Sequence, residues 1–232
     1  MNKERLTIAE WIIRSVMNLL GLFLLALGVV TGLQCGLGAS PFDVLQVGMT
    51  KYLPITVGQA SQILAVAFLI YTWSKGVIPG VGTILNAIFV GVFIDLIFTF
   101  GIQTPTTLTM KIVMLVASTV LAGVGIVLSL KAKIGVGTRD AFMEYVVTRT
   151  QKSVGLVRAT IEIIAFILGV VLVGMSGLGT TYGIGTIFIA LTLGHVITFA
   201  AKIMKYDFDV SNHYTFKDSI NLYKANKEHS LN

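Results

Sequence analysis

The fold is decided by the segment Gly36-Leu37-Gly38-Ala39-Ser40-Pro41-Phe42-Asp43-Val44-Leu45, which recurs in the second half as Ile134-Gly135-Val136-Gly137-Thr138-Arg139-Asp140-Ala141-Phe142-Met143. Aligning Asp43 with Asp140 brings further residues into register in the same order: Gly38 with Gly135, Gly58 with Gly155 and, after one insertion of six residues, Gly80-Val81-Gly82-Thr83 with Gly183-Ile184-Gly185-Thr186 and Gly91 with Gly194. An ordered series of matches in two halves of similar length indicates an internal duplication.

The composition places the 232 residues in a membrane. Hydrophobic residues make up 55% and charged residues 12%, and the mean hydropathy is +0.86. A soluble domain carries about 25% charged residues, so an ordinary cytosolic enzyme, a disordered protein and a disulfide scaffold are excluded. The single Cys35 excludes an internal disulfide and a multi-cysteine metal site. The net charge of +6 lies in loops and tails, so we expect the lipid bilayer as a partner and no nucleic acid.

Six apolar stretches approach the length of about 20 residues that a membrane-spanning helix needs. They are Trp11–Thr31, Val57–Trp73, Ile84–Phe100, Ile112–Leu130, Leu156–Gly174 and Ile184–Ala201. Lys and Arg accumulate on the cytoplasmic side of membrane proteins. With both termini inside, six crossings leave only Lys51 and Lys111 outside, whereas an alternative with eight crossings gives a slightly worse balance.

Each half therefore contains one span, a glycine-rich break, a short helix and two more spans. Because three crossings is an odd number, the second copy is expected to be inverted in the membrane, an arrangement that recurs in secondary transporters. The predicted organisation is a cytoplasmic N-terminus (1–10), repeat 1 (11–101) with a half-helix at 41–52, repeat 2 (110–204) with a half-helix at 138–150, and a cytoplasmic tail (205–232).

Each break ends where a short helix is expected to begin. Pro41 disfavours a helical conformation at Ser40 but suits the first turn of a helix, so Ser40 is a candidate N-cap with Asp43 three residues later. In the second copy, Thr138 stands where Pro41 does. One interpretation has the two half-helices entering the membrane from opposite faces, with their N-termini meeting near the midplane. The other places both on the membrane surface, with the two aspartates as simple caps.

The predicted central site gathers polar residues from the breaks and the fifth span: Ser40, Asp43, Thr138, Arg139, Asp140, Arg158 and Glu162. Arg158 and Glu162 share one helix face and form either a gate or substrate clamp, or a structural ion pair. Asp95 is interpreted as a solvated acid near the end of its span, and His195 as a hydrogen-bonded core residue rather than a proton relay. Several glycines, Gly91 and Gly194 among them, are expected to permit close helix packing.

Motifs of the common hydrolases, metalloenzymes and P-loop proteins are absent from the sequence. Asp43 and Asp140 could in principle form an acid pair like that of intramembrane aspartyl proteases, but their sequence context does not resemble those sites. We therefore predict that the protein is not an enzyme and uses no metal or cofactor.

The repeated segments resemble the YczE/YyaS/YitT family of bacterial membrane proteins, and its YczE-like branch in particular. Residues 36–45 are similar to the motif LG-x-x-PWDVL, residues 137–141 to GPRDAL, residues 153–162 to S-x-G-x-VR-x-x-x-E, and residues 182–186 to the GxGT step. Phe42 replaces the usual Trp, and Thr138 replaces the usual Pro, which weakens the cap at that helix start. The resemblance covers about Leu20 to Phe199 and implies a protein of the bacterial plasma membrane, without indicating a substrate.

The predicted function is secondary transport of an unidentified small solute. The aspartates favour a cationic or neutral polar solute, whereas Arg139, Arg158 and the helix N-termini favour an anionic one. Coupling to protons would use Asp43, Asp140 or Glu162. The alternative is a non-transporting accessory protein that binds a partner or supports a secretion or biosynthesis system. Oligomer formation is possible under either function.

Overall fold

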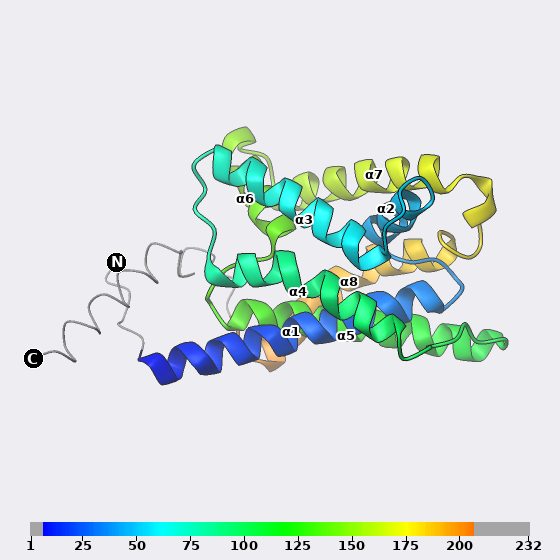
Figure 1. Cartoon of the computed structure of the whole chain (residues 1–232), viewed down its shortest axis with the longest axis horizontal. Helices are drawn as coiled ribbons and strands as arrows, with labels where there is room; N and C mark the ends of the chain where they lie inside the picture. Colours follow the sequence, from blue (N-terminus) through cyan, green and yellow to red (C-terminus); the bar gives the residue numbers. More distant parts are fainter. Residues whose placement is uncertain (1–6, 207–232) are drawn as a thin grey trace, which may run out of the picture.

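The computed structural model describes residues 7–206, which form a bundle of α-helices (Figure 1). In chain order the helices are α1 (Ile8–Gln34), α2 (Pro41–Thr50), α3 (Val57–Ser74), α4 (Val81–Phe98), α5 (Leu108–Lys131), α6 (Thr138–Thr150), α7 (Val154–Val173) and α8 (Ile184–Ile203), with a short 3-10 helix, Met175–Gly177, between the last two. The predicted all-helical fold is confirmed. Most of the predicted N-terminal segment and tail, at 1–6 and 207–232, lies outside the described residues.

Five of the described helices are long and apolar enough to cross a membrane: α1, α4, α5, α7 and α8. Their outer faces carry exposed apolar side chains, such as Ile163, Ile167 and Val171 on α7, which are 57%, 55% and 70% exposed. Because so large an exposed apolar surface requires lipid rather than water, the protein is a polytopic membrane protein. Helix α3 has nearly the bounds predicted for the second span, but it is not among the five, since Gln59 and Gln62 lower its hydropathy.

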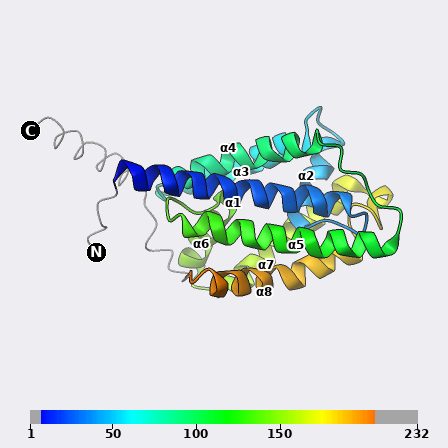
Figure 2. The same cartoon turned by 90° about the horizontal axis from the view of Figure 1, so that it is seen from below.

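Helices α1 and α5 run side by side in opposite directions along one side of the bundle (Figures 1 and 2). Their backbones approach closely at glycines: a Cβ atom on Gly21 would collide with the carbonyl oxygen of Gly125, and one on Gly28 with the backbone of Ala122. Small residues at a helix crossing permit this approach in membranes, where dispersion forces rather than the hydrophobic effect hold helices together.

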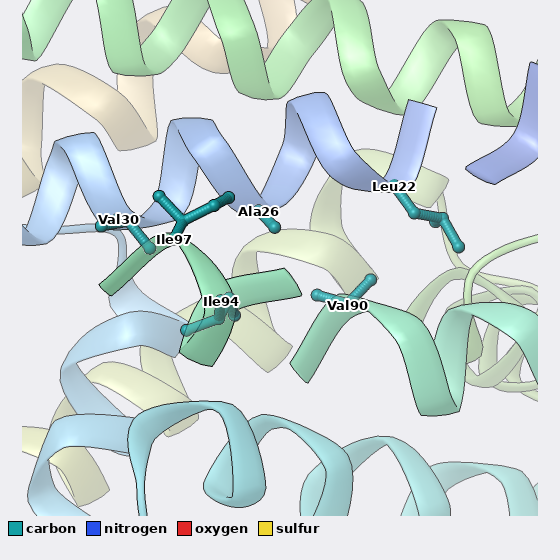
Figure 3. Packing of buried hydrophobic residues seen from close by; sticks show 6 residues of the cluster. All are labelled: Leu22, Ala26, Val30, Val90, Ile94 and Ile97. Atoms are coloured by element: carbon teal, nitrogen blue, oxygen red, sulfur yellow. The ribbon is translucent and has the colours of Figure 1, made fainter. Parts of the chain in front are cut away.

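The remaining helices pack against this pair or against one another. Helix α4 packs against α1, and α8 packs against α5, while α2 packs against α7, and α6 packs against α3. The largest buried apolar cluster joins α1 to α4 through Leu22, Ala26, Val30, Val90, Ile94 and Ile97 (Figure 3). The side chains on α1 recur every four residues, as expected for one face of a helix.

The two short helices begin at the predicted residues. Helix α6 spans Thr138–Thr150, as expected, whereas α2 ends at Thr50 rather than at residue 52. The earlier end of α2 follows from Pro54, which disfavours a helical conformation at the residue before it. Both short helices are well below the length of a spanning helix, so the alternative with eight crossings is not supported.

Candidate functional site

A cavity of about 700 Å³ lies at the centre of the molecule. All seven residues of the predicted central site line it: Ser40, Asp43, Thr138, Arg139, Asp140, Arg158 and Glu162. The structure therefore brings together side chains from α2, α6 and α7. Apolar residues of α1, α3, α4, α5 and α8 form much of the remaining wall.

The start of α2 is capped as the sequence predicts. Ser40 is the N-cap, and its Oγ accepts a hydrogen bond from the backbone N–H of Asp43 at 3.4 Å. The Ser40 hydroxyl in turn donates to Oδ2 of Asp43 at 2.7 Å. Asp43 is only 6% exposed, so this hydroxyl and the positive N-terminus of the helix compensate part of its lost hydration.

The start of α6 is satisfied by a different side chain. Its N-cap is Gly137, which has no side chain to accept a hydrogen bond. Instead, the backbone N–H and the hydroxyl of Thr138 both lie within hydrogen-bonding distance of Oδ1 of Asn86, at 3.4 and 3.5 Å. Asn86 belongs to α4, so this contact ties α6 to another helix.

The two helix starts face each other across the cavity. The guanidinium carbon of Arg139 lies 4.8 Å from the ring centroid of Phe42, a cation–π contact. Phe42 and Arg139 are aligned positions in the two halves. The contact therefore joins the starts of the two short helices.

Charged groups on α7 and α8 also line the cavity. On α7, Nε of Arg158 lies 3.2 Å from Oε1 of Glu162, as their spacing predicts. Both side chains are partly exposed to the cavity, at 32% and 19%.

His195 and Lys202 lie on α8 and line the same cavity. His195 is exposed rather than in the core, and its Nδ1 lies 3.0 Å from the carbonyl oxygen of Leu191, which corrects the predicted core placement.

The breaks contact the starts of long helices from the other half. The backbone N–H of Gly185, at the start of α8, donates to the carbonyl of Leu37 at 2.8 Å. The N–H of Gly82, at the start of α4, donates to the carbonyl of Ile134, also at 2.8 Å. The alignment pairs Leu37 with Ile134 and Gly82 with Gly185, so the two hydrogen bonds join equivalent positions.

Glycine is required within each break because the backbone approaches the neighbouring helix start closely. Gly38 and Gly135 have φ of +111° and +147°, values that L side chains rarely adopt. A Cβ on Gly38 would lie 2.6 Å from the backbone nitrogen of Gly183, and one on Gly135 would lie 2.7 Å from that of Thr83. These contacts explain why each half has a glycine at this position.

The two ends of the cavity differ. We call the end of the molecule where α1 begins the proximal end and the opposite one the distal end (Figure 1). At the distal end α3 packs against α4, and a Cβ on either Gly58 or Gly91 would collide with the carbonyl oxygen of the other. At the proximal end α7 and α8 border the cavity without packing extensively against each other, so the cavity is exposed there.

Asp95 has a structural role that the sequence interpretation missed. Its carboxylate accepts hydrogen bonds from the N–H of Gly58 at 3.0 Å and from the hydroxyl of Thr56 at 2.6 Å. Asp95 is therefore not merely a solvated acid, because it caps α3 and ties that helix start to α4. The spacing along the chain gave no signal for this contact.

Sequence reasoning also missed Gln46, Asn86 and Lys202 as cavity residues. Oε1 of Gln46 is buried and has no hydrogen-bond partner among the described residues. A buried acceptor without a donor is unfavourable, so this oxygen is a candidate contact for a bound polar molecule. Residues 7–206 contain no group of three His, Cys, Asp or Glu side chains arranged to hold a metal ion.

Comparison with known proteins gives relatives but no solved structure. Residues 12–202 match a family of unknown function, DUF6198. The chain is 30% identical to the uncharacterized membrane protein YczE of Bacillus subtilis (strain 168), in an alignment that covers 82% of this chain and 86% of YczE. It is 31% identical to an uncharacterized protein of Haemophilus influenzae, in an alignment that covers 77% of this chain and 79% of that protein. It is 27% identical to the uncharacterized protein YyaS of Bacillus subtilis, in an alignment that covers 69% of this chain and 82% of YyaS. No solved structure matches the chain.

These relatives confirm the resemblance to YczE and YyaS that rested on the two glycine-rich segments. The matched region contains both segments and all the residues that line the cavity. The chain belongs to the DUF6198 family, and the membrane protein YczE and the protein YyaS are among its relatives.

Proposed function

We propose that this integral membrane protein is a secondary transporter of a small solute, built from two inverted repeats with α2 and α6 as re-entrant half-helices. The observation that carries the proposal is the reciprocal pair of hydrogen bonds, from Gly185 to Leu37 and from Gly82 to Ile134, around one cavity. Each half supplies the broken segment that fits the helix start of the other. Secondary transporters place their solute sites at such discontinuous helices.

The burial of α2 supports a re-entrant helix over a surface helix. With ten residues, α2 is about 15 Å long, half the thickness of the hydrocarbon core of about 30 Å. Nevertheless, residues 41–46 are all buried inside the protein. Non-helical backbone at membrane depth is tolerated where it lies inside protein or against a polar cavity, and both breaks meet that condition here.

The charge distribution supports an orientation with the proximal end in the cytoplasm. Lys131, Lys152 and Lys202 lie at the proximal end, whereas Lys51 and Lys111 lie at the distal end. In a bacterial plasma membrane this bias puts both termini inside. The arrangement counts α3 as the sixth crossing, although it is less apolar than the other five.

The cavity chemistry supports a small polar solute with little net charge. Its carboxyl groups, Asp43, Asp140 and Glu162, are balanced by Arg139, Arg158 and Lys202. A neutral or zwitterionic solute would leave this balance intact, and an N–H or O–H group on it would satisfy Oε1 of Gln46. Asp43, the most buried of the acids, is the proposed proton-coupling group.

The inverted topology is tested by labelling cysteines at the ends of the half-helices. In a Cys35→Ala background, Lys51→Cys and Lys152→Cys place single thiols at exposed positions after α2 and α6. A membrane-impermeant maleimide added to intact cells is expected to label the first and, only after permeabilisation, the second. Labelling of both from the same side would contradict the inverted repeat.

Transport is tested by uptake of a panel of amino acids, other zwitterions and neutral polar solutes into proteoliposomes under a proton gradient. The proposal expects flux of at least one solute, with strong loss in Asp43→Asn and Arg139→Gln. Glu10→Gln serves as the control, because Glu10 is an exposed acid far from the cavity. Absence of flux for a broad panel, with binding of a partner protein retained, would favour the accessory role instead.

A further inference from the structure

The first half of the chain contains a helix contact that the second half lacks. At the distal end, Gly58 and Gly91 let the backbones of α3 and α4 approach closely, and Nε2 of Gln62 donates to the carbonyl of Ile88 at 2.8 Å. The caps from Asp95 to Thr56 and Gly58 complete this contact. Together they hold α3 against α4 at the distal end.

The second half keeps the glycines but not the contact. Gly155 and Gly194 align with Gly58 and Gly91, yet a Cβ added at either would meet nothing within 4 Å. Both residues are exposed and line the proximal part of the cavity. Glycine inside an exposed helix costs about 1 kcal/mol relative to alanine, so nothing in this conformation explains the glycine at position 194.

Helix α7 is held most firmly at its distal half. A Cβ at Gly169 would lie 2.7 Å from the backbone nitrogen of Leu45, and one at Gly48 would lie 2.7 Å from the Cβ of Leu172, so the distal half of α7 is fixed against α2. The start of α7, from Val154 to Leu156, is exposed. A rotation about the fixed half would carry Gly155 across the cavity towards α8.

We propose that the protein has a second conformation in which α7 closes onto α8 through Gly155 and Gly194, sealing the proximal end while the contact between α3 and α4 opens. The structure described here is then the proximally open state. The proposal rests on the inverted repeat of the proposed function, and it adds which helices move, where they meet and which residue holds the present state.

In the second conformation, the contact between α7 and α8 would be weaker than the present contact between α3 and α4. Thr198 aligns with Asp95, and in this structure its hydroxyl donates to Gly194 of its own helix at 2.9 Å. Ala159 aligns with Gln62, so neither the carboxylate cap nor the amide hydrogen bond has an equivalent. The contact at the proximal end is therefore the weaker of the two, which explains why the described state is the one closed by Asp95.

The test uses disulfide formation between pairs of cysteines in the full chain, in membranes and in a Cys35→Ala background. Ala159→Cys with Leu191→Cys reports closure of α7 onto α8, because these positions align with Gln62 and Ile88, which touch at the distal end. The matched pair Gln62→Cys with Ile88→Cys reports the distal contact. Ile163→Cys with Leu191→Cys is the background control, since Ile163 faces outward.

The proposal expects the proximal pair to crosslink above the background pair, though less than the distal pair. Asp95→Asn removes the charged acceptor that holds the distal contact and is expected to shift the ratio of proximal to distal crosslinking by about tenfold. Gly194→Leu, which has room in this structure, is expected to abolish the proximal crosslink and to leave the distal one unchanged.

Two results would overturn the proposal: proximal crosslinking no greater than background while the distal pair reacts, or proximal crosslinking that Asp95→Asn and Gly194→Leu leave unchanged. Because no solute is needed, the outcome is separate from that of the flux assay. Crosslinking without flux would retain the closure and reject transport, whereas flux without crosslinking would retain transport and reject this closure.

Discussion

The starts of α2 and α6 perform the same task with different side chains. Ser40 caps α2 with its own hydroxyl, and Pro41 follows with no N–H to satisfy. Gly137 has no side chain to cap α6. The N–H of Thr138 instead donates a hydrogen bond to Oδ1 of Asn86, which belongs to α4. The position aligned with Asn86 is Ile189, opposite a proline that needs no acceptor. The two helix starts thus have similar backbone geometry. The groups that satisfy their N–H donors differ between the halves, and the residues involved differ as a set.

The long helices α4 and α8 differ at aligned glycines, and substitutions there are expected to have the largest effect on stability. Gly91→Leu would force a side chain into the backbone of α3, whereas Gly194→Leu would meet open space. We expect Gly91→Leu to destabilise the protein by about 3 kcal/mol or more and Gly194→Leu by less than about 1 kcal/mol. Thermal unfolding in detergent measures both. Equal losses for the two variants would contradict the difference between the ends of the cavity.

Whether a contact could be predicted from the sequence depends on how far apart its residues are along the chain. The starts of the two short helices, the Ser40 cap and the pair Arg158–Glu162 follow from local spacing, and the structure confirms each. The contact between Phe42 and Arg139 joins positions that the alignment pairs, but local spacing does not predict it. The hydrogen-bond partners of Asp95 and Asn86 could not be predicted either, since they depend on how separate helices pack.

The second prediction exchanges the chemistry of one helix start for that of the other. Asn86→Ile leaves the N–H of Thr138 without its acceptor in a partly buried site and is expected to cost about 1–3 kcal/mol. Adding Thr138→Pro removes the orphaned donor at the first position of α6, where proline is tolerated. The double variant should recover most of the lost stability in a double-mutant cycle of thermal unfolding. A double variant less stable than Asn86→Ile alone would show that the two starts are not interchangeable.

The third prediction concerns the caps themselves. Ser40→Ala removes the hydroxyl that serves both the N–H and the carboxylate of Asp43, and it should cost about 1–2 kcal/mol. Gly137→Ala is the matched variant. Its backbone, at φ −56° and ψ 150°, suits alanine, and the nearest atom to the new Cβ is a movable carboxylate oxygen of Asp140. We expect a change within about 0.5 kcal/mol. Comparable losses at both positions would mean that the hydroxyl of Ser40 contributes nothing specific.

The smallest expected effect tests whether the ion pair on α7 serves stability or the cavity. Ser61 and Ala65 occupy the positions aligned with Arg158 and Glu162, so the first half manages without a pair. Because both charged side chains are partly exposed, Glu162→Gln should cost only about 0.2–0.5 kcal/mol of stability. Its effect on solute flux should be far larger if the pair contacts the solute, since removing the carboxylate leaves Arg158 uncompensated in the cavity. A variant that unfolds at the same temperature and transports as the unmodified protein does would assign the pair no role in either, and the charge asymmetry between the halves would then be incidental.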